Sequence, residues 1–169
     1  LNKENKVFVG KRKDNPEKHW QMPQGGVDIG ENFIDAMKRE LLEETSIKSI
    51  EILKEIDGWT QYELPDYLLG KIWKGRYRGQ KQKWFVVRFL GIDSEVNLKT
   101  KNPEFIEWKW IDVDSLPGVI VDFKKKLYEN LLPWKREQPN KSKIPSIPNK
   151  SKKHLTNPKI QQTSKNILS

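Results

Sequence analysis

Three glutamates crowd onto one short stretch of predicted helix, since Glu40, Glu43 and Glu44 all fall within "RELLEE". At 3.6 residues per turn they occupy an arc of roughly 100°. Like charges three and four residues apart destabilise a helix. A divalent cation removes that conflict, because Mg²⁺ binds a few carboxylate oxygens and completes its shell with water and phosphate oxygens. The alternative is an ordinary exposed acidic face, and the glutamates alone do not decide between the two.

The residues around the glutamates favour the metal site. Arg39 offsets only part of the negative charge and is expected nearest to Glu43. Gly25 and Gly26 predict a turn just before the helix, with backbone conformations closed to other residues. Glu31 stands at the junction of loop and helix, where the helix dipole favours a carboxylate. From there Glu31 can reach Arg39 and hold the loop against the helix.

Alternating or continuous apolar patterns predict the elements that must position these side chains. Strands are expected at residues 7–12, 50–56, 59–64, 84–92 and 105–111, with 84–92 the most apolar and therefore central. Two helices are expected, at 33–45 and 119–132. Strands on both sides of a helix, with a second helix at the end, indicate a mixed sheet between helices.

Apolar ridges on the two helices predict which faces pack on the sheet. The first ridge consists of Ile34, Met37 and Leu41, and the closing helix shows its own ridge at Val119, Phe123, Leu127 and Leu131. Four tryptophans are assigned to the core: Trp59, Trp84, Trp108 and Trp110. Residues 70–82 are expected to form a basic loop punctuated by glycine.

Residues 25–47 resemble the Nudix box, Gly-x5-Glu-x7-Arg-Glu-U-x-Glu-Glu-x-Gly-U, in which U is a bulky aliphatic residue. Eight of the nine defined positions match. The exception is Ser46, where the family has a glycine that usually supplies a left-handed helix cap. The resemblance implies an α/β/α sandwich, with activity on a nucleoside diphosphate linked to another group. A Ser at the cap costs about 1 kcal/mol of local strain and removes no metal ligand.

The Nudix resemblance also implies roles for the box residues. Glu40, Glu43 and Glu44 would bind Mg²⁺ or Mn²⁺, and Gly25 is counted with that metal site. Glu31 and Arg39 would form the supporting ion pair of the catalytic centre.

Four further stretches resemble the bacterial RNA pyrophosphohydrolase branch of the family, which is related to dinucleoside polyphosphate (diadenosine tetraphosphate) hydrolases. They are "WQMPQGG" (20–26), "GQKQKWF" (79–85), "NPEFIEWKW" (102–110) and "FKKKLY" (123–128). The resemblance runs from about residue 6 to residue 132. It lacks the branch's first strand, which is expected to precede Leu1.

Substrate contacts follow from this second resemblance. The residues expected at the phosphates are Tyr62, Gln80, Lys81, Lys83 and Lys124. Arg12 and Phe123 would sandwich the first base, since an unpaired base stacks well between an aromatic ring and a guanidinium plane. The chemistry of the basic loop agrees, because a polyphosphate chain needs several cations. On spacing alone, Phe123 could equally be a core residue of an amphipathic helix.

Glu104 follows a proline just before a predicted strand, so it is expected on a loop. By resemblance it is a metal ligand or the base that activates water, and the choice of base between Glu43 and Glu104 stays open. The expected reaction is hydrolysis of an RNA 5′-triphosphate or diphosphate to a 5′-monophosphate, which opens the RNA to decay. The alternatives are a diadenosine tetraphosphate hydrolase and a non-catalytic RNA-binding protein.

Charge and composition complete these expectations. The net charge is +9, but residues 135–169 hold nine basic residues and one acid, so residues 1–134 carry only +1. This charge division predicts a basic, low-complexity, disordered tail at 135–169, and the resemblance implies a Nudix domain at 1–134. The chain has no cysteine and no apolar run long enough to cross a membrane. A cytoplasmic monomer without membrane contact is expected.

Overall fold

The computed structural model describes residues 1–14, 19–71 and 75–133. The predicted basic tail, residues 135–169, lies outside them. The strands are β1 (Val7–Arg12), β2 (Trp20–Gln21), β3 (Ile50–Glu55), β4 (Thr60–Glu63), β5 (Gly79–Gln82), β6 (Phe85–Phe89) and β7 (Phe105–Ile111). The main helices are α1 (Phe33–Thr45), α2 (Leu116–Val119) and α3 (Asp122–Leu131).

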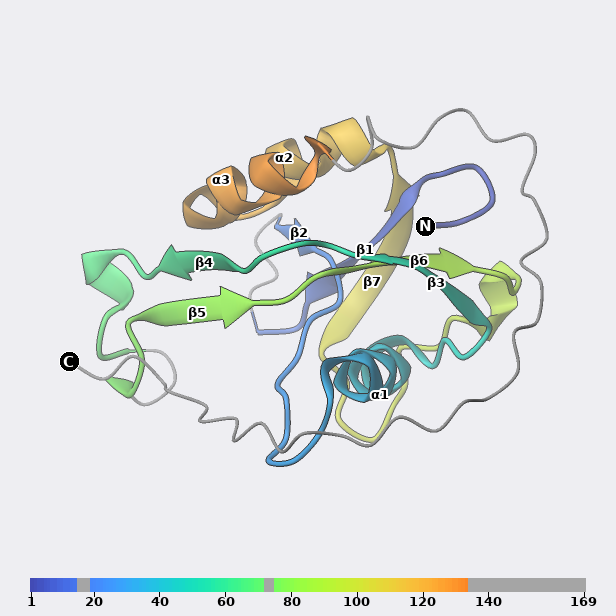
Figure 1. Cartoon of the computed structure of the whole chain (residues 1–169), viewed down its shortest axis with the longest axis horizontal. Coiled ribbons are helices and arrows are strands. Elements are labelled where there is room, and N and C mark those ends of the chain that lie inside the picture. The colour runs from blue at the N-terminus through green and yellow to red at the C-terminus, as the bar shows by residue number, and fades with distance from the viewer. Residues whose placement is uncertain (15–18, 72–74, 134–169) are drawn as a thin grey trace, which may run out of the picture.

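The strands lie between two helical layers, with α1 on one side and α2 and α3 on the other (Figure 1). β1 pairs antiparallel with both β2 and β7, β3 pairs with β6, and β4 pairs with β5. Leu1 donates to the carbonyl of Val87 at 2.7 Å and accepts from the N–H of Phe89 at 2.7 Å. Bonding to both neighbours of one residue is the pattern of a parallel pair, whereas all strand pairs assigned among the described residues are antiparallel. The predicted α/β/α sandwich is confirmed.

The period of two in β1 builds both halves of the core. Val7 and Val9 pack toward α3, in a cluster that includes Leu127 and Tyr128. Phe8 points to the opposite face, into a cluster of four buried residues: Phe8, Ile47, Phe89 and Phe105. One strand therefore anchors both layers, as side-chain alternation requires.

Two predictions about packing are wrong. Ile34 of the predicted α1 ridge is 40% exposed, and only Leu41 of that ridge packs against a core cluster. Trp59 is 48% exposed, whereas the other three predicted core tryptophans pack against the two clusters. α1 instead buries Ala36, Glu44 and Thr45, so one of the three predicted glutamates lies on its buried face.

The closing helix and the basic loop differ in their boundaries from the prediction. The helix begins at Asp122, because extended backbone at Ile120 separates it from α2. The end of the predicted loop forms β5, which pairs with β4 over Gly79–Gln82. A Cβ on Gly79 would stand 2.1 Å from the carbonyl oxygen of Tyr62, so this glycine permits the pairing. No helix among the described residues is long and apolar enough to cross a membrane.

Candidate active site

Both ends of α1 are capped, and the caps set where its glutamates lie. The side-chain oxygen of Asn32 accepts a hydrogen bond from the N–H of Asp35 at 2.9 Å. Ser46 adopts the left-handed conformation, with φ of 63°, and its N–H donates to the carbonyl of Leu42. Its Oγ also donates to the carbonyl of Asn97 at 2.9 Å. Ser46 therefore keeps the backbone shape for which the family motif uses glycine.

Gly25 is required by a close approach to Glu40. A Cβ at this position would stand 1.8 Å from the carboxyl carbon of Glu40 and 2.0 Å from its Oε2. Gly26 has open space around it, and neither glycine has positive φ. The predicted reason for the pair, a special turn conformation, is therefore wrong. The cradle for the Glu40 carboxylate explains Gly25 instead.

Arg39 ties the loop to the helix through a two-pronged ion pair. Its Nε and Nη2 donate to the two oxygens of Glu31 at 2.9 and 2.8 Å, and Nη2 also donates to the carbonyl of Gly26 at 2.8 Å. The Arg39 hydrogen bonds hold the pKa of Glu31 down at about 2. Nη1 lies 2.8 Å from Glu40 but 3.6 Å from Glu43, so the prediction that Arg39 sits nearest Glu43 is wrong. The loop contacts turn the guanidinium away from Glu43.

Glu44 is the buried member of the acidic set, only 2% exposed. Its Oε2 accepts from the N–H of Gln24 at 3.1 Å, while its Oε1 has no hydrogen-bond donor among the described residues. Burial, with the nearby charge of Glu104, raises the pKa of Glu44 to about 9. A buried carboxylate in this state is costly to ionise unless a cation arrives.

Glu104 lies on the loop just before β7, as predicted, and brings Arg12 with it. The Arg12 Nη1 donates to Glu104 at 2.9 Å, and its Nε donates to Asp14 at 2.6 Å. The predicted base-stacking arginine is therefore held by two carboxylates beside Glu44. Asp14 was not predicted, and its position in a turn-rich loop offered no signal.

The acidic residues fit a hard divalent cation, although the site is not preassembled. Among the described residues no group of three or more acidic or histidine side chains is spaced to hold one ion. Glu40 is turned toward Arg39, and the Glu43 side chain is 61% exposed. The donor chemistry nevertheless agrees with the ion, because carboxylate oxygens are its preferred ligands and Glu44 keeps one oxygen unpartnered.

A polar network joins the loop before α1 to the ribbon formed by β4 and β5. The Tyr62 hydroxyl donates to Gln80 at 2.7 Å, and the Gln82 amide donates to Gln24 at 3.3 Å. Lys124 also donates to Gln24, at 3.4 Å. Three predicted substrate residues, Tyr62, Gln80 and Lys124, thus come together. They are joined by Gln24 and Gln82, which were not predicted. Gln24 stands in the quoted "WQMPQGG" motif, and Gln82 follows Gln80 by one strand period, so both signals were available.

Lys124 is a buried cation at the edge of this network. Its side chain is 8% exposed overall, and Nζ lies 5.0 Å from the centre of the Tyr62 ring. Burial, assisted by the charge of Arg12, lowers the pKa of Lys124 to about 8. A phosphate oxygen at Nζ would relieve the burial of this charge.

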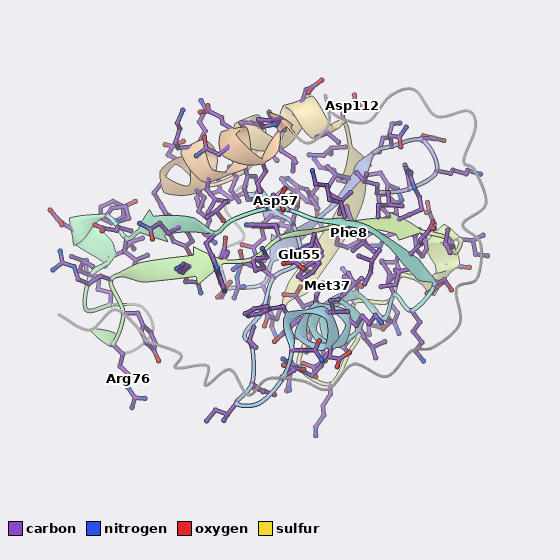
Figure 2. All side chains as sticks on the ribbon, in the orientation of Figure 1. Phe8, Met37, Glu55, Asp57, Arg76 and Asp112 are labelled. Atoms are coloured by element: carbon purple, nitrogen blue, oxygen red, sulfur yellow. The ribbon has the colours of Figure 1, made fainter. Side chains whose placement is uncertain are left out.

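Lys81 and Lys83 are not brought to the network. Side chains alternate along a strand, so Gln80 and Gln82 share one face of β5 while Lys81 points to the other. Lys81 Nζ lies 4.9 Å from the centre of the Trp59 ring. Lys83, beyond the strand, pairs with Glu55 at 2.8 Å. Arg76, another residue of the predicted basic loop, extends outward at the far end of the ribbon (Figure 2).

Phe123 and Arg12 line different cavities. The Phe123 ring lies 5.6 Å from the Tyr62 ring, in a cavity of about 500 Å³ between β4 and α3. Arg12 lines a small cavity of about 30 Å³ with Trp20 and Ile120. The base sandwich by these two residues therefore stays a prediction, and it needs the Arg12 ion pairs to rearrange.

Comparison with known proteins agrees with this geometry. Residues 1–131 match the family model described as the NUDIX domain. A protein of Pelagibacter ubique named RNA pyrophosphohydrolase is 61% identical over 131 residues, which cover 78% of this chain and 83% of that one.

Solved structures share the fold at low identity. The dihydroneopterin triphosphate pyrophosphohydrolase of E. coli aligns with a TM-score of 0.57 at 19% identity, over 78% of this chain and 88% of that one. An Ap4A hydrolase of C. elegans, solved as a binary complex, aligns with a TM-score of 0.54 at 19% identity, over 78% and 87%. The family match, the identity to the bacterial relative and the acidic edge of α1 agree, and the chain belongs to the Nudix hydrolase family.

Proposed function

We propose that this chain is an RNA pyrophosphohydrolase, which uses Mg²⁺ or Mn²⁺ to convert a 5′-triphosphate or diphosphate end of RNA to a 5′-monophosphate. The observation that carries the proposal is the 61% identity to the Pelagibacter ubique protein of that name. The geometry supports it from the other side, since an acidic helix edge, a buried lysine and an amide network converge beside an aromatic cavity.

The metal would be held by Glu40, Glu43, Glu44 and Glu104. When bound, Mg²⁺ or Mn²⁺ would neutralise charge on the phosphate oxygens and lower the pKa of water. The protein's own groups do the rest. Arg39 and Glu31 hold the loop so that Gly25 stays against Glu40, which fixes one carboxylate in place.

The substrate's phosphates would meet the network opposite α1. Lys124 Nζ and the Tyr62 hydroxyl are donors that already lie together, at Gln24 and Gln80. They would orient the chain of phosphates against the carboxylates, which is where most of the rate gain in phosphoryl transfer arises. Glu43 or Glu104 would accept the proton of the attacking water. Glu43 has the greater access to solvent, with a side chain 61% exposed compared with 42% for Glu104.

The biological setting follows from this substrate. An enzyme that exposes a 5′-monophosphate makes an RNA open to decay, and such RNA is in the cytoplasm. We therefore propose that the protein acts in the cytoplasm, and the expectation that it is a monomer stays a prediction.

The test is a Mg²⁺-dependent release assay on RNA labelled at its 5′ γ-phosphate. Wild-type protein should release label and leave a 5′-monophosphate, and a chelator should stop the release. A parallel assay on diadenosine tetraphosphate at the same salt concentration compares the two kcat/KM values, because phosphate contacts make affinity depend on salt. A higher value on the dinucleotide would replace RNA as the main substrate. Tight binding of triphosphorylated RNA with no release would instead indicate a binding protein.

A further inference from the structure

Trp59 is an exposed aromatic residue in a position that folding alone does not explain. It stands just before β4 and is half exposed, although its ring is large and apolar. It makes a T-shaped contact with the half-buried Phe33, with ring centres 5.3 Å apart and planes at 85°. The Lys81 ammonium lies 4.9 Å from the centre of the same ring. Trp59 is therefore held in place from two sides while much of its surface stays open to solvent.

Phe33 connects this ring to the catalytic edge. It is the first residue of α1, and Glu40 follows seven residues later. Seven residues turn the helix through about 700°, so Phe33 and Glu40 share a face, about 10 Å apart along the axis. Glu44 falls on the same face one turn further. Trp59 thus stands in line with the carboxylates, at the end of the row opposite Glu44.

Trp59 and Phe123 both line the cavity between β4 and α3, but their rings have different neighbours: Trp59 contacts Phe33 and Lys81, and Phe123 contacts Tyr62. The strand period places the Trp59 ring on the Lys81 face of the ribbon and Tyr62 on the Gln80 face. A volume of about 500 Å³ lies in the range of small-molecule sites. Phe123 belongs to the predicted site of the first base, whereas Trp59 has no role in that prediction.

We propose that Trp59, with Lys81 above it, is a second stacking site for a nucleobase of the substrate, separate from the site at Phe123. An exposed indole beside a lysine suits an unpaired nucleotide, because the base stacks on the ring while the ammonium meets a phosphate. The base would come from the next nucleotides of the RNA or from the second nucleoside of a dinucleoside polyphosphate. The proposal rests on the proposed function, since it places a second part of that substrate.

The experiment compares Trp59→Ala with Trp59→Phe and wild type on three ligands. These are a triphosphorylated RNA of five unpaired nucleotides, diadenosine tetraphosphate, and adenosine triphosphate as a competitive inhibitor with only one base. Removing a stacking ring should weaken binding about 5- to 150-fold for a ligand that uses it. We expect that loss in Trp59→Ala for the RNA, the dinucleotide or both, little loss in Trp59→Phe, and an unchanged inhibition constant for adenosine triphosphate. The multi-base ligand that loses affinity identifies the source of the base.

Controls separate this site from a structural effect. Tyr67→Ala removes another exposed aromatic residue and should leave all three constants unchanged. Lys81→Gln keeps the ring and should lower the slope of log affinity against log salt by about 1 for the RNA. Equal losses for all three ligands in Trp59→Ala, or no loss for either multi-base ligand, would overturn the proposal.

Equilibrium titration with the same RNA in a chelator gives a readout that does not need turnover. If Trp59→Ala binds the RNA more weakly than wild type in this titration, but wild type with Mg²⁺ releases no pyrophosphate, the proposed function is refuted and the stacking site stands. If wild type is active and Trp59→Ala binds the RNA as tightly as wild type, the stacking site is refuted and the proposed function stands.

Discussion

α1 and the ribbon of β4 and β5 contribute to the same site, but they hold their polar side chains by different means. On α1 the helical period alone gathers the glutamates. The preceding loop braces them through Glu31, which pairs with Arg39 of the helix, and through Gly25. On the ribbon, the period of two divides the polar side chains between opposite faces, so neighbours in sequence have different surroundings. Gln80 joins the network at Tyr62, and Lys81 goes to Trp59. The helix is suited to holding the reactive centre, and the ribbon to reading two parts of a substrate.

Breaking the α1 half should have the largest effect. Glu43→Gln removes a proposed metal ligand and base, and Glu44→Gln removes a proposed metal ligand. We expect kcat to fall by about 10²–10⁴-fold in each, a range typical for loss of a positioned catalytic group. Chelation should abolish release in wild type, and added Mg²⁺ should restore it. The measurement is steady-state pyrophosphate release.

Glu51→Gln is the matched control, because Glu51 is an exposed glutamate on β3. Its kcat should stay within about 2-fold of wild type, as expected for a surface substitution away from the site. Urea unfolding of Glu44→Gln should show no loss of stability, since glutamine carries no charge to bury. Wild-type activity in Glu43→Gln and Glu44→Gln would contradict the assignment of α1.

Filling the space beside the Glu40 carboxylate should cause a smaller loss of activity. Gly25→Ala puts a Cβ where the Glu40 carboxylate lies, so that carboxylate must move. A displacement near 1 Å can cost about 10² in rate, and we expect that loss in kcat/KM. Gly26→Ala is the control, since a Cβ there meets open space. Equal activity of the two variants would show that Glu40 does not need its present position.

Replacing Lys124, which lies on α3 beside the ribbon, should have two moderate effects: greater stability and weaker substrate binding. Its pKa is lowered from 10.5 to about 8, so the folded protein bears the cost of a buried charge below pH 8, and this cost fades between pH 8 and 10.5. Lys124→Met should therefore be more stable than wild type at pH 7, by up to about 3 kcal/mol, with the difference shrinking toward pH 10.5. The same variant should raise KM for triphosphorylated RNA about 10-fold, because a phosphate contact is lost.

Urea unfolding at pH 7 and pH 10 without substrate measures the stability of Lys124→Met, and steady-state kinetics measures its KM. Lys125→Met changes an exposed neighbour on α3 and should leave the pH profile of stability as in wild type. A gap between Lys124→Met and wild type that is constant over pH would mean that Lys124 is not buried as a cation.

The same division explains what could be predicted from the sequence. The Glu31–Arg39 ion pair, the glutamate edge and the left-handed cap at Ser46 depend on local spacing, and the structure contains all three. The contacts of Arg12, Lys81 and Trp59 depend on distant partners. A strand register or a loop conformation decides them, and neither is encoded in a short motif.

Two errors in the prediction show this limit most clearly. The apolar ridge of α1 was read as its packing face, but Ile34 is exposed while Glu44 is buried, because the helix turns its catalytic edge inward. Gln82, unlike Lys81, was within reach of sequence reasoning, since residues two apart on a strand share a face. The prediction treated residues 70–82 as a basic loop, so it did not consider the alternation of side chains along β5.

The smallest effect should come from Ser46, where α1 departs from the family motif. Ser46→Gly removes left-handed strain of about 1 kcal/mol but also the hydrogen bond to Asn97, which is worth about 1 kcal/mol. The two changes oppose each other, so the free energy of unfolding measured in urea should change by less than about 0.5 kcal/mol. Ser46→Ala keeps the strain and loses the bond, and should destabilise by about 1 kcal/mol. Activity should not change in either variant. If Ser46→Gly proved clearly more stable, the bond to Asn97 would contribute little, and the helix end would depend on the backbone conformation alone.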